Sequence, residues 1–443
     1  MYISEQLGQF GSQFHRAELA PEVLHHAKRA IVDWYAALVP GSVMAPTPLL
    51  EQAYADDLGR GKARLALGRM ATTRTAALIN GTAAHTAEVD DIFKEAIYHP
   101  GAPTISAALA VAQQQGASGL ELIKAVIVGY EVSTRIGKVL GRAHYQYWHN
   151  TGTVGAFGAA AAAAYLLQLD ALRFTHALCT VATFAAGLQQ AFKMDSMSKP
   201  LHSGRAAEAG VAAAEMARQG VTGSLDVFEG GSGLGVAMSN GPEWQAVMDD
   251  LGQRFNICAM TFKNHACCGH TFAPIDGALV LQQRHGIAWQ DIERVCVETY
   301  APALAVAGNP APLTAAQARF SIPFVVATAL RHGSVRLAAF APERLHDAEL
   351  RALMGRVELK VHPELDAQFP GQRAARVTLH TRGGQAHAYL QPTRKGDPDM
   401  ALTDAELQGK YDELVVPVLG AQKSADIARV LWALEQQAAV DML

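Results

Sequence analysis

The sequence predicts a mostly α-helical protein with a smaller α+β part, and three observations support this prediction. Half of the 443 residues are hydrophobic, yet only 7% are aromatic, and alanine supplies much of the apolar content, as in Gly158 to Leu167. Apolar residues recur at helical spacing over the first 260 or so residues, whereas segments beyond about residue 290 alternate with a period of two. Because alanine is the best helix former and lets helices approach closely, we expect a multilayered helical bundle.

Residues that favour helix starts mark the helices of the first part. Pro21 opens an apolar-periodic segment that continues to Leu38. Ser118 stands three residues before Glu121, which is the spacing of a capping box, and Asp170 precedes a further helical segment. We therefore expect one helix after another through this part of the chain.

The period-two segments at 294–300, 356–361 and 375–390 predict strands, and Gly383-Gly384 within the last one indicates a hairpin. A helical segment over 313–330 lies between the first two, and it starts with Thr314 and Gln317 at capping-box spacing.

A last helical segment follows Thr403, which stands three residues before Glu406. The changes of period divide the chain into domains. We predict a large helical domain over 1–264 and 396–443, and a smaller α+β domain over 265–395.

Composition and charge exclude several classes of protein. The net charge is −4 and the isoelectric point is near 6.5, and no run of five or six basic residues occurs, so we expect no nucleic-acid partner and no membrane partner. No stretch of about 18 uncharged apolar residues predicts a transmembrane helix. The first residues resemble the start of a folded chain rather than a leader, and the five cysteines are sparse and odd in number, so we expect a cytoplasmic protein.

Motifs for metals, nucleotides and serine nucleophiles are weak or missing. Cys267 and Cys268 lie close to His265 and His270, but adjacent cysteines rarely ligate one tetrahedral ion, and no second Cys-x-x-Cys pair exists. The glycine-rich stretch 230–239 is neither a phosphate-binding loop nor a full dinucleotide fingerprint. No Gly-x-Ser-x-Gly follows a predicted strand. We therefore expect neither a metal nor a nucleotide cofactor.

Five segments place reactive side chains beside glycine, proline or small residues. Each has an ordinary alternative: a single histidine near apolar residues is commonly a hydrogen-bonded core group, and a lysine before proline is commonly an exposed loop charge. Together the segments supply the groups for acid–base chemistry on a small polyanion, because Lys and Arg hold carboxylates while His, Tyr and Asp move protons. The candidate residues are Asp90, Asp91, His99, Tyr145, His149, Lys199, His202, Arg205, Lys263, His270 and Arg319.

Proline restrains the backbone before two of these residues. His99 precedes Pro100 and Lys199 precedes Pro200, and the residue before proline is disfavoured in a helix. We therefore expect His99 to end a loop, and Lys199 to lie outside the helix that follows it. We also expect Asp90 or Asp91 to lie within reach of His99.

Six segments, in order along nearly the whole chain, resemble the MmgE/PrpD family, which includes 2-methylcitrate dehydratase, iminodisuccinate epimerase and cis-aconitate decarboxylase. They contain, among others, Asn-Gly…His…Asp-Asp…His-Pro, Trp-His-Asn-Thr-Gly-Thr-Val-Gly and Lys-Pro-x-His-x-Gly-x-Ala-Ala. The resembling segments are 80–100, 147–170, 198–210, 262–279, 318–330 and 395–414.

The resemblance implies a large all-helical domain formed by both chain ends, a smaller α+β lid domain, and a homodimer. It also implies an active site in the cleft between the domains, a small polycarboxylate substrate, and no metal or organic cofactor. By matching position, the functional residues would be Asp90, Asp91, His99, Tyr145, His149, Lys199, Lys263 and, less closely aligned, His270.

The chain departs from the family pattern at four positions. Glu88 replaces the usual first aspartate, Val89 an aromatic residue and Ile92 a common threonine, and Ala307 occupies the position expected for the tyrosine of the decarboxylase. The leading hypothesis is a dehydratase that removes a proton α to a carboxylate. An epimerase, a decarboxylase of an unsaturated tricarboxylate, and a catalytically silent helical binding protein remain as alternatives.

Overall fold

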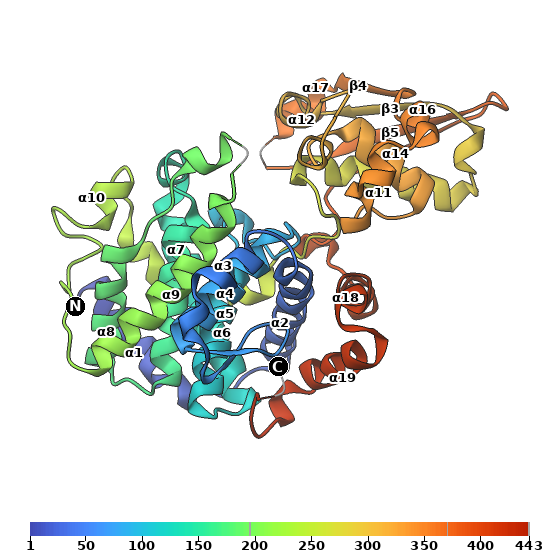
Figure 1. The fold of residues 1–443 in the computed structure, drawn as a ribbon. Coiled ribbons are helices and arrows are strands. Elements are labelled where there is room, and N and C mark those ends of the chain that lie inside the picture. Colours follow the sequence, from blue (N-terminus) through green and yellow to red (C-terminus); the bar gives the residue numbers. More distant parts are fainter. Residues whose placement is uncertain (195, 370, 442–443) are drawn as a thin grey trace. The chain divides into compact units, whose positions relative to one another are not determined.

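The computed structural model describes residues 1–194, 196–369 and 371–441, and the chain divides into two compact units (Figure 1). Unit 1 comprises Met1–Phe262 together with Thr403–Leu443, and unit 2 comprises Lys263–Leu402. Both ends of the chain therefore belong to the same unit.

Unit 1 is predominantly helical, in agreement with the predicted fold class. Its helices are α1 (Ile3–Gln13), α2 (Pro21–Ser42), α3 (Thr47–Ala53), α4 (Thr73–Thr86), α5 (Gly101–Gln115), α6 (Gly119–Tyr145), α7 (Asn150–Leu166), α8 (Ala171–Val181), α9 (Ser198–Arg218), α10 (Leu234–Met238), α18 (Asp404–Leu419) and α19 (Ala421–Trp432).

Helix α7 lies at the centre of unit 1, and every one of its residues is buried. It packs against α5, α6 and α9, while α4 packs on α5 and α9 (Figure 1). The alanine and glycine residues of α7 are small enough to allow this close approach on all sides, which confirms the multilayered bundle. The C-terminal helices α18 and α19 pack against α2.

The predicted N-cap residues cap their helices, but the capping box expected at Ser118 is incomplete, because the Glu121 carboxylate accepts a hydrogen bond from the Tyr165 hydroxyl instead. The side chain of Ser118 accepts a hydrogen bond from the backbone N–H of Glu121, and that of Asp170 accepts one from Arg173. Thr403 and Glu406 form a complete capping box at the start of α18.

The expectation of one helix after another over the first 260 residues is wrong in two places. Strands β1 (Leu58–Arg64) and β2 (Met70–Ala71) form a small antiparallel ribbon. Between residues 219 and 262 the described chain forms turns and 3₁₀ segments around the short helix α10. This stretch is rich in glycine, aspartate and asparagine, which favour turns over long helices.

Unit 2 combines a four-stranded sheet with short helices. The strand order is β4-β3-β5-β6, with β3 and β4 parallel and the other two pairs antiparallel. Helix α11 packs on β5 and β6, and α14 packs on α11 and β4. The elements are α11 (Phe272–His285), β3 (Ile292–Thr299), α12 (Ala301–Ala307), α13 (Ala315–Ala318), α14 (Ile322–His332), α15 (Pro342–Leu345), α16 (Ala348–Met354), β4 (Val357–Val361), α17 (Pro363–Gln368), β5 (Ala375–Thr381) and β6 (Ala386–Gln391).

The three predicted strand segments and the hairpin are confirmed, but the helix predicted over 313–330 is interrupted. Thr314 caps α13 as expected. The chain then leaves the helix, and Ser321 begins α14 by accepting a hydrogen bond from the N–H of Phe324. Pro323, in the first turn of α14, lacks the N–H that a continuous helix would use there. Arg319 consequently lies between the two helices.

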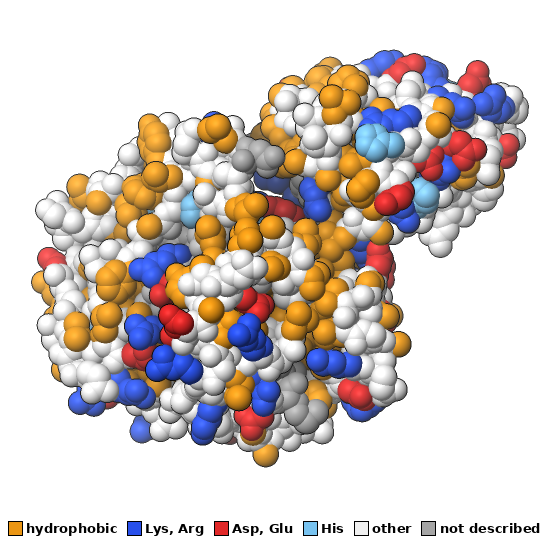
Figure 2. Space-filling view, viewed as in Figure 1, with side chains coloured by type: hydrophobic (Ala, Val, Ile, Leu, Met, Phe, Trp, Pro, Cys, Tyr) orange, Lys and Arg blue, Asp and Glu red, His pale blue; other side chains and the backbone are white. Residues whose placement is uncertain are grey.

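In the described part of the chain, no helix is long and apolar enough to cross a membrane. On the face seen in Figure 2, Lys and Arg side chains are interspersed with Asp and Glu over both units.

Candidate acid–base site in unit 1

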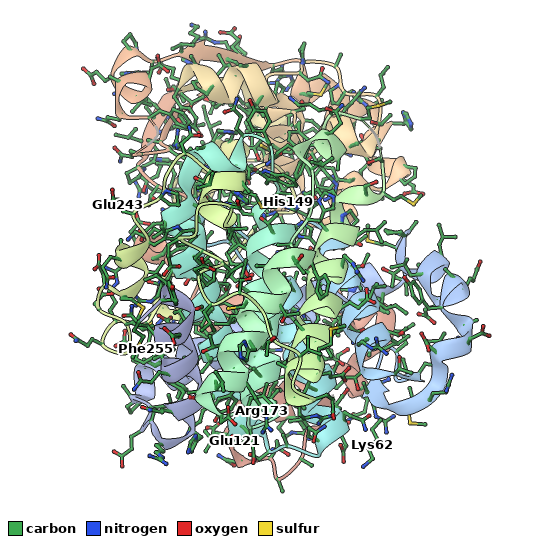
Figure 3. All side chains as sticks on the ribbon, turned by 90° about the vertical axis from the view of Figure 1, so that its left-hand side faces the viewer. Lys62, Glu121, His149, Arg173, Glu243 and Phe255 are labelled. Carbon is green, nitrogen blue, oxygen red and sulfur yellow. The ribbon has the colours of Figure 1, made fainter. Side chains whose placement is uncertain are left out.

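Four of the chemically reactive side chains in unit 1 lie at helix ends. His99 precedes α5, His149 is the N-cap residue of α7, Lys199 lies in the first turn of α9, and His85 lies in the last turn of α4. Figure 3 shows His149 at one end of the bundle, with Arg173 near the opposite end. The N-terminal ends of three helices that pack on one another therefore bring these groups together, and their dipoles favour a bound anion there.

Asp90 links two of the histidines. Its Oδ2 lies 2.7 Å from Nδ1 of His85 and 3.2 Å from Nδ1 of His99. The aspartate is buried, which alone would raise its pKa, but the two imidazoles hold the pKa well below its usual range. The contact predicted between His99 and one of the two aspartates is thus made by Asp90. A carboxylate this close to the ring favours the protonated form of the imidazole.

Asp91, the next residue, is in a different environment. Its Oδ1 accepts a hydrogen bond from the N–H of Gly101 at 3.0 Å, and its Oδ2 accepts one from the Tyr130 hydroxyl at 2.7 Å. Burial, followed by the charge of Asp33, raises the pKa of Asp91 to about 8. A Cβ at Gly101 would lie 2.8 Å from Asp91 Oδ1, so only glycine fits this contact. The neighbouring aspartates therefore have opposite pKa shifts, with Asp90 ionised and Asp91 protonated at neutral pH.

His149 and His202 form a second imidazole pair. Their Nδ1 atoms are 3.1 Å apart, and the ring of His149 also stacks on that of His85 at 5.4 Å. Burial lowers the pKa of His149 well below its usual range, and it lowers that of His202 to about 4, so both are neutral. One Nδ1–H must then donate to the other Nδ1. The pair consequently has one Nε2 that can accept a proton and one that can donate.

Lys199 Nζ forms an ion pair with Glu88, and the ammonium lies 5.2 Å from the ring centroid of Phe192. The prediction that Lys199 lies outside the helix is wrong, because α9 begins at Ser198. Proline is tolerated in this first turn, since N–H groups there have no acceptor within the helix. The ammonium still lies at the N-terminal end of α9.

The loop between α4 and α5 contains two strained residues. Glu88 has φ 61° and Ile97 has φ 49°, so two residues other than glycine adopt the left-handed conformation. Such residues cost on the order of 1–3 kcal/mol each, and they are concentrated at functional sites. Between these two residues the loop is held by backbone hydrogen bonds from Ile92 to Thr261 and from Phe93 to Tyr98.

A buried lysine from the C-terminal helix α18 also supports this loop. Lys410 Nζ donates to Asp33 Oδ1 on α2 and to the carbonyl oxygen of Val89, both at 2.6 Å. Burial raises the pKa of Asp33 to about 6 despite the lysine. The last part of the chain therefore contributes directly to the position of the segment that contains Asp90 and Asp91.

The same cluster includes a set of atoms that could bind a metal ion. One ligand atom each from His85, Asp90 and His99 lies within 4.8 Å of the others, and two imidazoles with one carboxylate are a set that zinc and other transition metals accept. Cys267, which the sequence analysis considered as a metal ligand, is not part of this set, and its Sγ lies 3.0 Å from the Thr271 hydroxyl.

The two remaining predicted residues of unit 1 lie on α6 and α9. Tyr145 lies partly buried at the end of α6. Arg205 lies on α9, but its side chain is 59% exposed and pairs with Glu208 on the same helix. The structure therefore brings together Asp90, Asp91, His99, His149, Lys199 and His202.

Three predicted residues belong to unit 2. Lys263 is buried at the start of the unit, and His270 Nδ1 lies 2.8 Å from the Tyr300 hydroxyl. Arg319 donates to the carbonyl oxygen of Ala266 at 2.7 Å, which gives its guanidinium a role in holding the backbone of unit 2.

Sequence reasoning missed His85, Tyr130 and the Glu88–Lys199 ion pair. His85 could have been found, because it lies one turn or so before Asp90 at the predicted end of a helix. Tyr130, on α6, gives no such signal, since it meets Asp91 only through the packing of α6 on α5.

A buried cluster of carboxylates, neutral imidazoles and a lysine at helix N-termini is typical of acid–base centres that act on small anions. The particular family follows from comparison with known proteins: the chain belongs to the MmgE/PrpD family. The model of the MmgE/PrpD N-terminal domain matches residues 5–247, and that of the C-terminal domain matches residues 265–436. The end of the C-terminal match falls in unit 1, where α18 supplies Lys410.

Relatives with assigned names are similar over most of the chain. A cis-aconitate decarboxylase-like protein, oryM, of Aspergillus oryzae is 26% identical over 100% of this chain and 96% of its own length. A cis-aconitate decarboxylase of Aspergillus terreus is 26% identical over 98% of this chain and 93% of its own. The cis-aconitate decarboxylase of Mus musculus is 27% identical over 76% and 70%.

Proposed function

We propose that this protein is a lyase that acts next to a carboxylate of a small polycarboxylate, without a metal or organic cofactor. The observation that supports this most directly is the pairing of two distinct imidazole systems in one cluster. His99 Nδ1 lies 3.2 Å from the Asp90 carboxylate, and the rings of both His99 and His149, the latter paired with His202, lie against the ring of His85.

In this proposal the two systems divide the proton transfers. The free Nε2 of the His149–His202 pair removes a proton α to the substrate carboxylate. His99 enters the reaction as an imidazolium beside the Asp90 carboxylate, and it gives its proton to the leaving hydroxyl as the C–O bond breaks. One proton is taken up, one is delivered, and water leaves.

The developing enolate-like charge requires stabilisation that water provides poorly. Lys199 and the N-terminal ends of α5, α7 and α9 supply positive potential, and each well-placed donor contributes about 3 kcal/mol to the transition state. Glu88 neutralises Lys199 in the structure described here. A substrate carboxylate would therefore replace Glu88 as the partner of the ammonium.

Dehydration of a hydroxy-polycarboxylate, as in 2-methylcitrate dehydratase, is the first candidate reaction because the cluster contains both an acid and a base. Decarboxylation of cis-aconitate is the second, and the names of the relatives favour it. The family resemblance implies a tyrosine in the decarboxylase at the position that Ala307 occupies here, which is a point against the second candidate. The homodimer and the cytoplasmic location remain predictions.

Incubation in D₂O with a panel of di- and tricarboxylates, followed by proton NMR, tests the proposal. New vinyl protons from citrate, or a methyl singlet on a double bond from 2-methylcitrate, indicate dehydration, and loss of CO₂ from cis-aconitate indicates decarboxylation. Deuterium exchange without net conversion indicates an epimerase. The matched variants are His99→Gln, which should abolish the reaction, and the exposed His25→Gln, which should not. No exchange or conversion with any member of the panel would contradict the proposal.

A further inference from the structure

Helix α6 carries a group of buried polar side chains that the proposed proton transfers do not use. Glu131, Thr134 and Arg135 are at most 4% exposed, and residues three and four apart lie on the same side of a helix. Tyr130, directly before Glu131, donates its hydroxyl hydrogen bond to Asp91 Oδ2 at 2.7 Å. This part of α6 therefore already contacts the loop that carries the two neighbouring aspartates.

Glu131 and Thr134 hold the start of a second segment, residues 256–261. Oε1 of Glu131 accepts a hydrogen bond from the backbone N–H of Asn256 at 2.6 Å, and the side-chain amide of Asn256 donates to Oγ1 of Thr134 at 3.0 Å. Asn256 is only 6% exposed, so water competes little for either contact. The first residue of the segment is therefore fixed to α6 at two points.

The far end of this segment pairs with the loop. Thr261 and Ile92 exchange two backbone hydrogen bonds, at 2.8 and 2.9 Å, and Ile92 is the residue after Asp91. The contacts therefore form a closed ring: from α6 to the loop at Asp91, from the loop to the segment at Ile92, and along the segment back to α6 at Glu131. A loop held at two neighbouring residues cannot shift without breaking one of these contacts.

Arg135 holds the chain that leads into the segment. Its guanidinium donates to the carbonyl oxygen of Asp249 and, at 2.9 Å, to that of Arg254, while its Nε donates to Glu131 Oε2 at 3.2 Å. Asp250, between these two acceptors, has φ 50°, and such a left-handed residue other than glycine costs on the order of 1–3 kcal/mol. The Glu131–Arg135 pair therefore fixes a stretch whose shape its own backbone preferences oppose.

A buried ion pair of this kind is a costly way to stabilise a fold. Burial raises the pKa of Glu131 to about 7, although Arg135 and two backbone N–H groups favour the ionised form. Replacing a buried ion pair with apolar residues is often neutral or stabilising. The arrangement is therefore better explained by the conformation that it specifies than by a contribution to the free energy of unfolding.

We propose that Glu131 is a positioning residue: through the segment 256–261 it fixes the loop on which the two neighbouring aspartates lie. Helix α6 thus acts on this loop twice, directly through Tyr130 and indirectly through Glu131. With the loop fixed in this way, Asp90 keeps its contact with His99. The expected effect on turnover rests on the proposed function of unit 1, whereas the link from Glu131 to the loop does not depend on the reaction.

Amide hydrogen exchange of the full-length protein tests the link without any turnover. Glu131→Met removes both acceptor oxygens, so the amides of Ile92 and Thr261 should exchange about tenfold faster or more, as in a local opening, while those of helix α8 should not change. Glu131→Gln keeps an acceptor for the N–H of Asn256 and should retain most of the protection. If Glu131→Met does not fold, Thr134→Val removes only the second contact to Asn256 and should accelerate the same two amides, to a smaller extent.

Glu121 provides a matched control on the same helix. Its carboxylate is also partly buried and accepts a hydrogen bond from the Tyr165 hydroxyl, but it lies at the end of the bundle opposite His149 (Figure 3). Glu121→Met should therefore leave the exchange of Ile92 and Thr261 unchanged.

Turnover separates positioning from folding. In Glu131→Met, kcat should fall about 10–10²-fold with KM nearly unchanged, because a small displacement of the loop misplaces Asp90 and His99 and leaves Lys199 in position. The proposal is overturned if the exchange of Ile92 and Thr261 is unchanged, if the amides of α8 accelerate equally, or if exchange accelerates while kcat stays at the wild-type value. Accelerated exchange in a protein whose wild type converts no polycarboxylate would overturn the proposed function and leave the link from Glu131 to the loop standing.

Discussion

The buried and partly buried charges of the two units differ in how they are balanced. In unit 1 each charged group of the cluster has a partner from the chain itself: Asp90 lies between two histidines, and Lys199 is paired with Glu88. In unit 2 Arg394 has Asp397, but Arg373 has no carboxylate among the described residues.

The difference indicates two ways of binding an anion. A ligand bound at Lys199, as proposed for unit 1, would have to displace Glu88, so its binding free energy would be reduced by the cost of breaking that ion pair. A ligand in unit 2 would supply a charge that the chain does not provide. Because Glu88 can return to Lys199 when a ligand leaves, the arrangement in unit 1 favours release of a product. A cation such as Arg373, which has no carboxylate of the described chain within ion-pair distance, would instead favour retention of an anion.

Replacing Lys199 has the largest expected effect of the tests that follow. Lys199→Met keeps the aliphatic stem and removes the charge, so turnover should fall by about 10²–10³, the loss seen when one preorganised donor is removed. Lys199→Arg should rescue poorly, because a planar fork does not replace a compact ammonium. The melting temperature should change little, because a partly exposed ion pair contributes only about 0–1 kcal/mol to stability.

Two matched variants make this test specific. Lys138→Met removes an exposed lysine that is also paired with a glutamate, and it should leave turnover unchanged. Glu88→Gln should lower KM if Glu88 competes with the substrate for Lys199. Wild-type turnover in Lys199→Met would rule out the electrostatic role and would leave the ion pair with Glu88 as a surface feature.

The second prediction concerns the protonation state of Asp91, a buried acid whose neighbours do not balance a negative charge. Burial raises its pKa from 3.8 to about 8, so the folded protein binds a proton that the unfolded chain releases. The stabilisation associated with this proton is complete below about pH 4 and is lost as the pH rises through about 8. Asp91→Asn mimics the neutral acid, so its melting temperature should fall less steeply than that of the wild type between pH 5 and 8.

Melting curves of the two proteins over this pH range decide the point. Their difference removes the contributions of other buried acids, such as Asp33 and Glu131, whose pKa values are also raised by burial. Parallel curves would show that Asp91 is ionised in the folded protein, and the contrast with Asp90 would then be lost.

Much of this molecule could be predicted from its sequence because the signals are local. Alanine content, helix caps at Ser118, Asp170 and Thr403, and the Gly383-Gly384 hairpin each depend on neighbouring residues. The helix predicted over 313–330 is too long, because the apolar periodicity continues across Ser321. In the structure Ser321 is the N-cap residue of a new helix.

The candidate site was predicted only in part, since its contacts join distant segments. The spacing of His99 and the two aspartates indicated a contact, but it did not indicate which aspartate would be ionised. That distinction depends on Tyr130, Asp33 and Lys410, which reach the loop through helix packing. No local pattern reports such contacts.

The last prediction concerns metal, and here the expected effect is none. The ligand atoms of His85, Asp90 and His99 lie within 4.8 Å of one another, so the cluster of unit 1 has the composition of a metal site. Two ligand atoms of a tetrahedral zinc ion are roughly 3.3 Å apart, given metal–ligand distances near 2.0–2.1 Å. The 2.7 Å between Asp90 and His85 is shorter and fits a shared proton instead. Turnover should therefore be unchanged after exhaustive chelation and dialysis, with less than stoichiometric metal by elemental analysis. Added zinc should inhibit, because it would replace the proton shared by these residues, and His85→Gln should weaken that inhibition. Stoichiometric metal that is lost together with activity, and that restores activity when it is returned, would contradict this prediction and would mean that an ion balances the charge of Asp90.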